Sequence, residues 1–181
     1  MHTNDENWLV PAKYIPSPNY NQRPQGVEVN LLVIHCISLP PDQFGGTEIT
    51  DFFLNQLDCN QHPYFERLKN LTVSSHLLIR RDGEVIQFVP FNQRAWHAGD
   101  SQFQGIKDCN DFSIGIELEG SENQAFTERQ YEVLTKATCA IMRRYPLIDL
   151  NRIVGHSDIA AGRKSDPGPH FDWDKFYKLL S

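Results

Sequence analysis

The sequence has no excess of positive charge and no basic run. It contains 17 Lys and Arg residues against 23 Asp and Glu residues, a net charge of −6 with histidine neutral. Because nucleic acids are polyanions, this balance argues against a nucleic-acid partner. The sequence also lacks an apolar run of the roughly 20 residues that cross a bilayer, and MHTNDENWLV at the N-terminus has no apolar export segment. We therefore expect a soluble, cytoplasmic protein with no membrane partner.

Cysteine pairs, repeats and changes in composition are also missing. The four cysteines have no CxxC spacing, and a cytosolic chain would keep them as thiols. Nothing divides the 181 residues, a length that supports one domain with a full-sized core. We therefore predict a single domain over residues 1–181. The Pro-rich residues 1–28 suit an extended N-terminal arm, with Trp8, Tyr14 and Tyr20 as its predicted anchors.

Apolar patterning predicts strands and helices that alternate along the chain. The predicted strands are residues 29–35, 75–80, 84–89 and 112–119. The second and third are joined through Asp82-Gly83, a strong signal for an antiparallel hairpin. The predicted helices begin after the N-cap residues Thr47, Thr127 and Asp172. We therefore predict an α/β fold in which helices flank a central mixed β-sheet, with loops 38–46 and 58–72 bordering a cleft.

Histidine ends two apolar runs that have the pattern of buried strands. The run 29–34 ends at His35, and the run 153–155 ends at His156. If these strands are neighbours that end at the same edge of a sheet, both imidazoles meet there. Asp166 follows ten residues later, in a loop that Pro-Gly-Pro restricts. Because protein-bound zinc takes at least three such ligands in a tetrahedral arrangement, these three side chains are candidate metal ligands.

Each of these residues also has an ordinary structural explanation. His35 alone is as compatible with a hydrogen-bonded core histidine as with a ligand, and Asp166 before proline can simply begin a turn. No compact HExxH-type signature is present to select the ligands. Pattern alone leaves other histidines in competition, namely His2, His62, His76, His97 and His170.

A hydrolytic zinc site also needs a base and a positive group near the reacting carbonyl oxygen. Glu117 lies mid-strand on the small, polar face of the run 112–119, and Lys164 lies two residues before Asp166. These two residues are candidates for the base and the positive group. Taken singly, such charges are most often solvated surface residues.

Several separate segments carry a resemblance to a known family. In chain order they are LLVIH (31–35), SSHLLIRRDGEVIQFVP (74–90), AWHAG (95–99), NDFSIGIELEG (110–120), GHSDIA (155–160) and GRKSDPGP (162–169). Together they resemble the zinc-dependent N-acetylmuramoyl-L-alanine amidases of the type-2 amidase fold, which peptidoglycan-recognition proteins share. The resemblance implies that His35, His156 and Asp166 bind Zn²⁺. It also implies that Glu117 is the catalytic base and that Lys164 stabilises the oxyanion.

The resemblance implies a substrate as well. Phage endolysins and animal peptidoglycan-recognition proteins generally have a cysteine as third ligand, so Asp166 points to the cytoplasmic branch that acts in cell-wall recycling. Such an enzyme hydrolyses the amide between the lactyl group of 1,6-anhydro-N-acetylmuramic acid and L-alanine, which lowers the muropeptides that induce β-lactamase. Trp96, His97 and Cys36 become expected substrate contacts, with Cys36 where the family leads us to expect asparagine. We expect a monomer whose partner is the anhydro-muropeptide.

Two other functions remain open. A non-catalytic peptidoglycan-binding module on the same fold would hold a muropeptide without cutting it, although the complete ligand set and Glu117 favour catalysis. An amidase that acts on intact peptidoglycan would use the same site. The missing export signal favours soluble muropeptides over that substrate.

Overall fold

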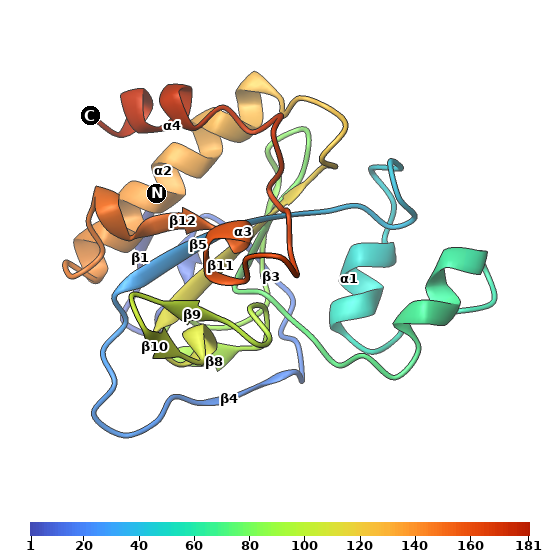
Figure 1. Cartoon of the computed structure of the whole chain (residues 1–181), viewed down its shortest axis with the longest axis horizontal. Helices are drawn as coiled ribbons and strands as arrows, with labels where there is room; N and C mark the ends of the chain where they lie inside the picture. The colour runs from blue at the N-terminus through green and yellow to red at the C-terminus, as the bar shows by residue number, and fades with distance from the viewer.

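The computed structural model describes residues 1–181, and a six-stranded mixed sheet forms its centre (Figure 1). From one edge to the other the strands are β12 (Ile153–Gly155), β5 (Leu31–Ile37), β11 (Ser113–Glu119), β6 (Leu77–Ile79), β7 (Val85–Gln87) and β3 (Lys13–Tyr14). The first four strands are parallel, β7 is antiparallel to β6, and β3 is parallel to β7. The predicted mixed sheet is therefore confirmed.

The hairpin between β6 and β7 turns where Asp-Gly predicts it. The Arg80 N–H donates to the Glu84 carbonyl at 2.9 Å, and the Gly83 N–H donates to the Arg80 carbonyl at 2.9 Å. Gly83 has φ +89°, in the left-handed region that glycine adopts without a steric penalty. This tight turn sets the register of the only antiparallel pair in the central sheet.

One face of the sheet is covered by α2 (Glu128–Arg144) and α4 (Trp173–Leu180), which lie together in Figure 1. Thr127 caps α2 in a complete capping box with Gln130, and the Asp172 carboxylate accepts a hydrogen bond from the Lys175 N–H at 2.9 Å. Both predicted N-caps are confirmed. A cluster of 22 buried apolar residues fills the space between these helices and the sheet, and it includes Leu77 from β6.

The other face of β6 and β7 packs against α1 (Glu48–Phe53) and the 3₁₀-helix η1 (Pro63–Leu68). Successive strand side chains point to opposite faces, so Leu78 joins this second cluster of ten buried apolar residues. Thr47 precedes α1 as predicted, but its side chain does not cap the helix and donates to the Asp51 carboxylate at 2.6 Å. The prediction that residues 58–72 are mostly loop misses η1, because six residues of 3₁₀-helix are too few to give a clear apolar period.

The N-terminal arm carries β1 (His2–Thr3), β2 (Leu9–Val10), β3 and β4 (Tyr20–Gln22). The prediction that its aromatic residues anchor it is wrong for Tyr14 and Tyr20, whose side chains are 45% and 40% exposed. Buried polar residues hold the arm instead: the Ser17 hydroxyl donates to the Phe53 carbonyl at 2.6 Å, and the Asn19 amide donates to the Val73 carbonyl at 2.8 Å.

Short elements complete the chain. They are β8 (Gln93–Ala95), β9 (Gln102–Phe103), β10 (Ile106–Lys107), η2 (Cys109–Asp111), η3 (Leu150–Arg152) and α3 (His156–Ile159). The four cysteines are all free thiols. None of the helices combines the length and the hydropathy that a bilayer span requires.

Candidate metal centre and active site

Two histidines meet at one edge of the sheet. Strands β12 and β5 are parallel neighbours, with Gly155 opposite Ile34. His35 is therefore one residue beyond this pair on β5, and His156 is the first residue after β12. Their Nδ1 atoms lie 3.0 Å apart, and both side chains are buried. The pairing of the two strands thus brings together imidazoles that are 121 residues apart in sequence.

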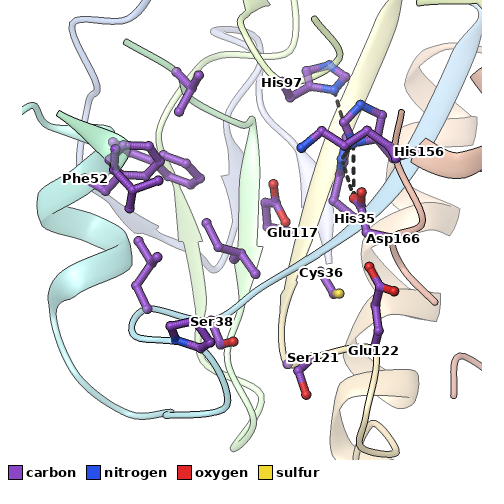
Figure 2. Close-up of a pocket in the computed structure, with 18 of the residues that line it drawn as sticks. His35, Cys36, Ser38, Phe52, His97, Glu117, Ser121, Glu122, His156 and Asp166 are labelled. Atoms are coloured by element: carbon purple, nitrogen blue, oxygen red, sulfur yellow. Dashed lines mark hydrogen bonds and ion pairs between the residues drawn. The ribbon is translucent and has the colours of Figure 1, made fainter. Parts of the chain in front are cut away.

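Asp166 completes this group from the loop after α3. Its Oδ2 lies 3.1 Å from the Nδ1 of His35 and 3.1 Å from the Nδ1 of His156 (Figure 2). The Ser157 N–H donates to the Asp166 carbonyl at 2.9 Å and fixes the loop beside α3. These three side chains form the group of potential metal ligands, and their donor atoms all lie within 4.8 Å of one another.

The chemistry of the donor set fits a metal ion. The Nε2 of His156 lies 3.1 Å from the Ala98 carbonyl, which only accepts, so Nε2 carries the proton and a neutral ring leaves a lone pair on Nδ1. That lone pair faces the Asp166 carboxylate and His35 Nδ1, an arrangement that requires a proton or a cation between them. Burial lowers the pKa of His35 to about 4, although the hydrogen bond to Asp166 opposes this shift. His35 is therefore neutral near pH 7, as a metal ligand must be.

Glu117 lies next to these ligands because β11 is the parallel neighbour of β5. Glu117 lies opposite His35 in the pairing of the two strands, and Figure 2 shows its carboxylate beside the three ligands. The side chain is 9% exposed, and its Oε2 atom is buried without a hydrogen-bond partner. Burial raises the pKa of Glu117 well above its usual value, and the negative charge of Asp166 adds to the shift. A carboxylate with a raised pKa is a stronger base than an exposed one.

These residues line one wall of a cleft of about 480 Å³. The opposite wall is largely apolar and includes Phe52, Tyr64, Leu68 and Leu71. Residues of loops 38–46 and 58–72 line the cleft, as the sequence predicts. Lys164 also lines it, from the same loop as Asp166, and its side chain is exposed. The cleft therefore has candidate metal ligands and catalytic groups on one side and a surface suited to apolar contact on the other.

The three expected substrate contacts all line this cleft, but their surroundings differ. The Trp96 indole N–H donates to the Asn21 side chain at 2.8 Å. Burial raises the pKa of the Cys36 thiol, and the charge of Glu117 raises it further, which makes this thiol a poor nucleophile. Both ring nitrogens of His97 already have protein partners, His35 and Ser113. Contact with substrate remains a prediction for each of them.

Four of the five competing histidines have other surroundings and lie outside the ligand group. The His76 ring is buried, its Nδ1 accepts from the Gly115 N–H at 3.0 Å, and its Nε2 lies 3.1 Å from the Gln93 carbonyl. The His62 ring accepts from the Tyr64 N–H at 3.1 Å and caps η1. His2 and His170 are exposed and lie outside the group.

Sequence reasoning missed the role of a half-buried cation in the N-terminal arm. The Arg23 guanidinium donates to four backbone carbonyls, those of Asn110, Asp111, Ser113 and Phe91, at 2.8–3.0 Å. These contacts tie the arm to the start of β11. Nothing in the composition of the arm signals this role, since its partners lie 68 to 90 residues away.

The comparison with known proteins agrees with this geometry. Residues 25–169 match the family described as N-acetylmuramoyl-L-alanine amidase, which is most of the chain. The chain belongs to this amidase family. It is therefore a hydrolase, and the fold class expected from the sequence is confirmed.

Relatives of the amidase are similar over nearly its whole length. It is 53% identical over 177 residues to the 1,6-anhydro-N-acetylmuramyl-L-alanine amidase AmpD of Citrobacter freundii, which covers 98% of this chain and 94% of that one. A crystal structure of a selenomethionine AmpD derivative matches it with a TM-score of 0.96 at 52% identity and covers 100% of both chains. The amidase AmiD from E. coli, in complex with anhydro-N-acetylmuramic acid-L-Ala-D-γ-Glu-L-Lys, matches with a TM-score of 0.61 at 30% identity. That match covers 87% of this chain and 60% of AmiD.

Proposed function

We propose that this protein is a zinc-dependent amidase of anhydro-muropeptides. It hydrolyses the amide between the lactyl group of 1,6-anhydro-N-acetylmuramic acid and L-alanine, in the cytoplasm and as a monomer. Its role is in cell-wall recycling, where it releases stem peptide and thereby lowers the muropeptides that induce β-lactamase.

The observation that carries the proposal is the convergence of three ligand atoms beside one unpartnered carboxylate. His35, His156 and Asp166 present their donor atoms at 3.0–3.1 Å from one another, and Glu117 is paired in register with His35. Two imidazoles and one carboxylate are ligands that suit zinc, and three protein ligands are typical of a catalytic site. A purely structural zinc site would use a fourth protein ligand.

The side chains of the cleft have separate roles in the reaction. When bound, zinc supplies Lewis acidity, which polarises the lactyl carbonyl and makes water a stronger acid. Glu117 accepts the proton of the attacking water on its free carboxylate oxygen and later returns it to the alanine nitrogen. The new C–O bond forms on the lactyl carbonyl carbon as the C=O π pair moves onto the oxygen, and the C–N bond breaks when that pair re-forms the carbonyl. The Lys164 ammonium, which also lines the cleft, balances the negative charge that develops on the carbonyl oxygen.

The substrate is inferred from the relatives and from the cleft. The relative from Citrobacter freundii is named for 1,6-anhydro-N-acetylmuramyl-L-alanine, and the AmiD complex contains an anhydro-muramyl tripeptide. A muropeptide has a sugar ring and an extended peptide, which suits a cleft that has an apolar wall and Trp96 in its lining. We assign the scissile amide to the side of the cleft that holds Glu117 and the three ligands.

A cleavage assay combined with metal analysis tests the proposal. The zinc-loaded protein is incubated in parallel with soluble anhydro-muropeptide and with intact sacculi, and released peptide is measured by mass spectrometry. We expect free stem peptide from the soluble substrate only, and loss of activity after chelation with recovery on adding zinc. Binding of muropeptide without release would indicate a non-catalytic module. Faster release from sacculi would indicate a lytic amidase.

A further inference from the structure

One short segment, His97–Ala98, contacts the far side of both histidine ligands. The Nε2 of His35 lies 2.9 Å from the Nδ1 of His97, and the Nε2 of His156 lies 3.1 Å from the Ala98 carbonyl. Figure 2 shows His97 above the ligand rings, on the side away from Asp166. Each ligand imidazole therefore has one nitrogen toward the candidate metal position and the other toward this segment.

The two contacts differ in how they set the tautomer of the ring. A carbonyl only accepts, so Ala98 keeps the proton of a neutral His156 on Nε2. The contact between His35 and His97 allows either ring to donate. His35 binds a metal through Nδ1 only when His97 accepts at its own Nδ1. The His97 proton is then on Nε2, 3.2 Å from the Ser113 hydroxyl, which accepts it.

The segment is itself held by directional contacts. The buried Asn110 side-chain oxygen accepts two hydrogen bonds, from the His97 N–H at 3.1 Å and from the Ala98 N–H at 2.8 Å. The Arg163 guanidinium donates to the Ala98 carbonyl at 2.7 Å and so fixes its direction. A single amide side chain therefore positions both atoms that meet the ligand imidazoles.

Gly115 provides the space for the His97 ring. A Cβ atom on this residue would lie 2.5 Å from the Cγ of His97, which is closer than real carbon contacts. Gly115 lies in β11, which pairs with β5 on one side and β6 on the other, so its backbone cannot shift freely to make room. The missing side chain thus lets the ring lie against the strand with Nδ1 toward His35.

We propose that His97 is a positioning residue: it accepts the Nε2 proton of His35, and together with the Ala98 carbonyl it holds both ligand imidazoles with Nδ1 free for the metal. This role is separate from the substrate contact that the family resemblance implies for His97. It rests on the zinc site proposed above. Substituting a residue that hydrogen-bonds to a metal ligand typically lowers metal affinity or activity by ~10- to 100-fold.

Paired substitutions of His97 test the acceptor. Asparagine carries its amide oxygen at the same point of the side chain as Nδ1, whereas leucine has the same branching and no acceptor. Zinc affinity is measured by competition with a chromophoric chelator. We expect His97→Leu to weaken zinc binding by ~10- to 100-fold and His97→Asn to retain most of the wild-type affinity. Equal affinity for the leucine and asparagine variants overturns the proposal.

Gly115→Ala gives an independent variant that keeps His97 but displaces its ring. We expect weaker zinc binding from this protein, and wild-type affinity in it counts against the proposal.

Long-range ¹H–¹⁵N spectra of zinc-loaded wild-type protein then give a readout that needs no variant to fold. The proposal requires the His97 proton on Nε2, and a proton on its Nδ1 overturns it. Failure of the wild-type protein to bind zinc would instead overturn the metal site itself.

Discussion

The two walls of the cleft are held in place by different forces. On the ligand wall, contacts at 3.1 Å or less link His35, His156, Asp166 and the 97–98 segment through directional groups. The opposite wall consists mainly of α1 and η1, which project from the sheet in Figure 1 and pack through a cluster of ten buried apolar residues. One wall is fixed by hydrogen-bond geometry and the other by apolar burial.

This difference matches what each wall has to do. Catalytic groups must keep their positions within about half an ångström, and hydrogen bonds restrict both distance and direction. Apolar contacts are non-directional, so a wall built from them tolerates small shifts and substrates of varied shape. We therefore expect changes on the ligand wall to remove metal or turnover, and changes on the apolar wall to alter substrate affinity.

The largest effect is expected from Asp166→Ala on the ligand wall. The carboxylate is one of three ligands, so its loss should reduce zinc after dialysis from about one ion per chain to nearly none. Activity should fall to the assay background. Zinc per protein is measured by atomic emission, with Asp174→Ala, an exposed carboxylate on α4, as control. An Asp166→Ala protein that keeps its zinc and its turnover would contradict the ligand assignment.

Glu117→Gln should separate activity from stability. A lost general base lowers kcat by ~10²–10⁴, measured by peptide release at saturating substrate. The folded protein binds a proton on Glu117 more tightly than the unfolded chain, since burial raises its pKa above 4.5. Stability from that proton is present below the unfolded-state pKa and is lost as pH rises through the folded-state pKa. Because glutamine does not titrate, the Glu117→Gln protein does not lose stability in this way as pH rises.

The melting temperature of the zinc-free protein reports this second effect. Relative to wild type, we expect Glu117→Gln to melt roughly 3–6 °C higher at pH 8, equivalent to about 1–2 kcal/mol, with a smaller difference near pH 5. The zinc-free form is used because a nearby dication would itself lower the pKa of the carboxyl group. A difference that is independent of pH would argue against a buried titrating carboxyl group.

Lys164→Ala should lower turnover and leave the metal in place. Removing one group that stabilises an oxyanion typically costs ~10²–10³ in kcat, and no ligand is lost. Zinc content and kcat are measured on the same preparation, and Lys178→Ala on the exposed side of α4 is the control. Loss of zinc in the Lys164 variant would mean that the lysine supports the metal site and not the transition state.

The ligand wall was more predictable from sequence than the apolar wall. His35 and His156 end runs whose apolar residues mark buried strands, so their place at a sheet edge follows from local pattern. Choosing them over the other histidines depended on family motifs, because periodicity gives the direction of a side chain and not its distance from another strand. The caps at Thr127 and Asp172 were equally local, and the structure confirms both.

Features that depend on distant partners were not predictable in this way. Asn110 positions the 97–98 segment, and Arg23 binds carbonyls more than sixty residues away, yet neither residue has a local pattern that reveals its partner. Tyr14 and Tyr20 of the arm are expected to anchor it, whereas the Ser17 and Asn19 side chains hold it by donating to the Phe53 and Val73 carbonyls. Such contacts are set by how the sheet and the arm pack, which a sequence window does not contain.

The smallest effect, and the sharpest test of the apolar wall, is expected from Leu71→Ser. Leu71 lines the cleft and is 50% exposed, so its replacement removes apolar contact without opening a hole in the core. Such a change should raise KM a few-fold and leave kcat and zinc content unchanged, because it weakens ground-state and transition-state binding alike. Leu147→Ser is the matched control, since Leu147 is 48% exposed and lies outside this cleft. A fall in kcat without a change in KM would mean that this wall also positions the reacting amide, and the division between the two walls would then be wrong.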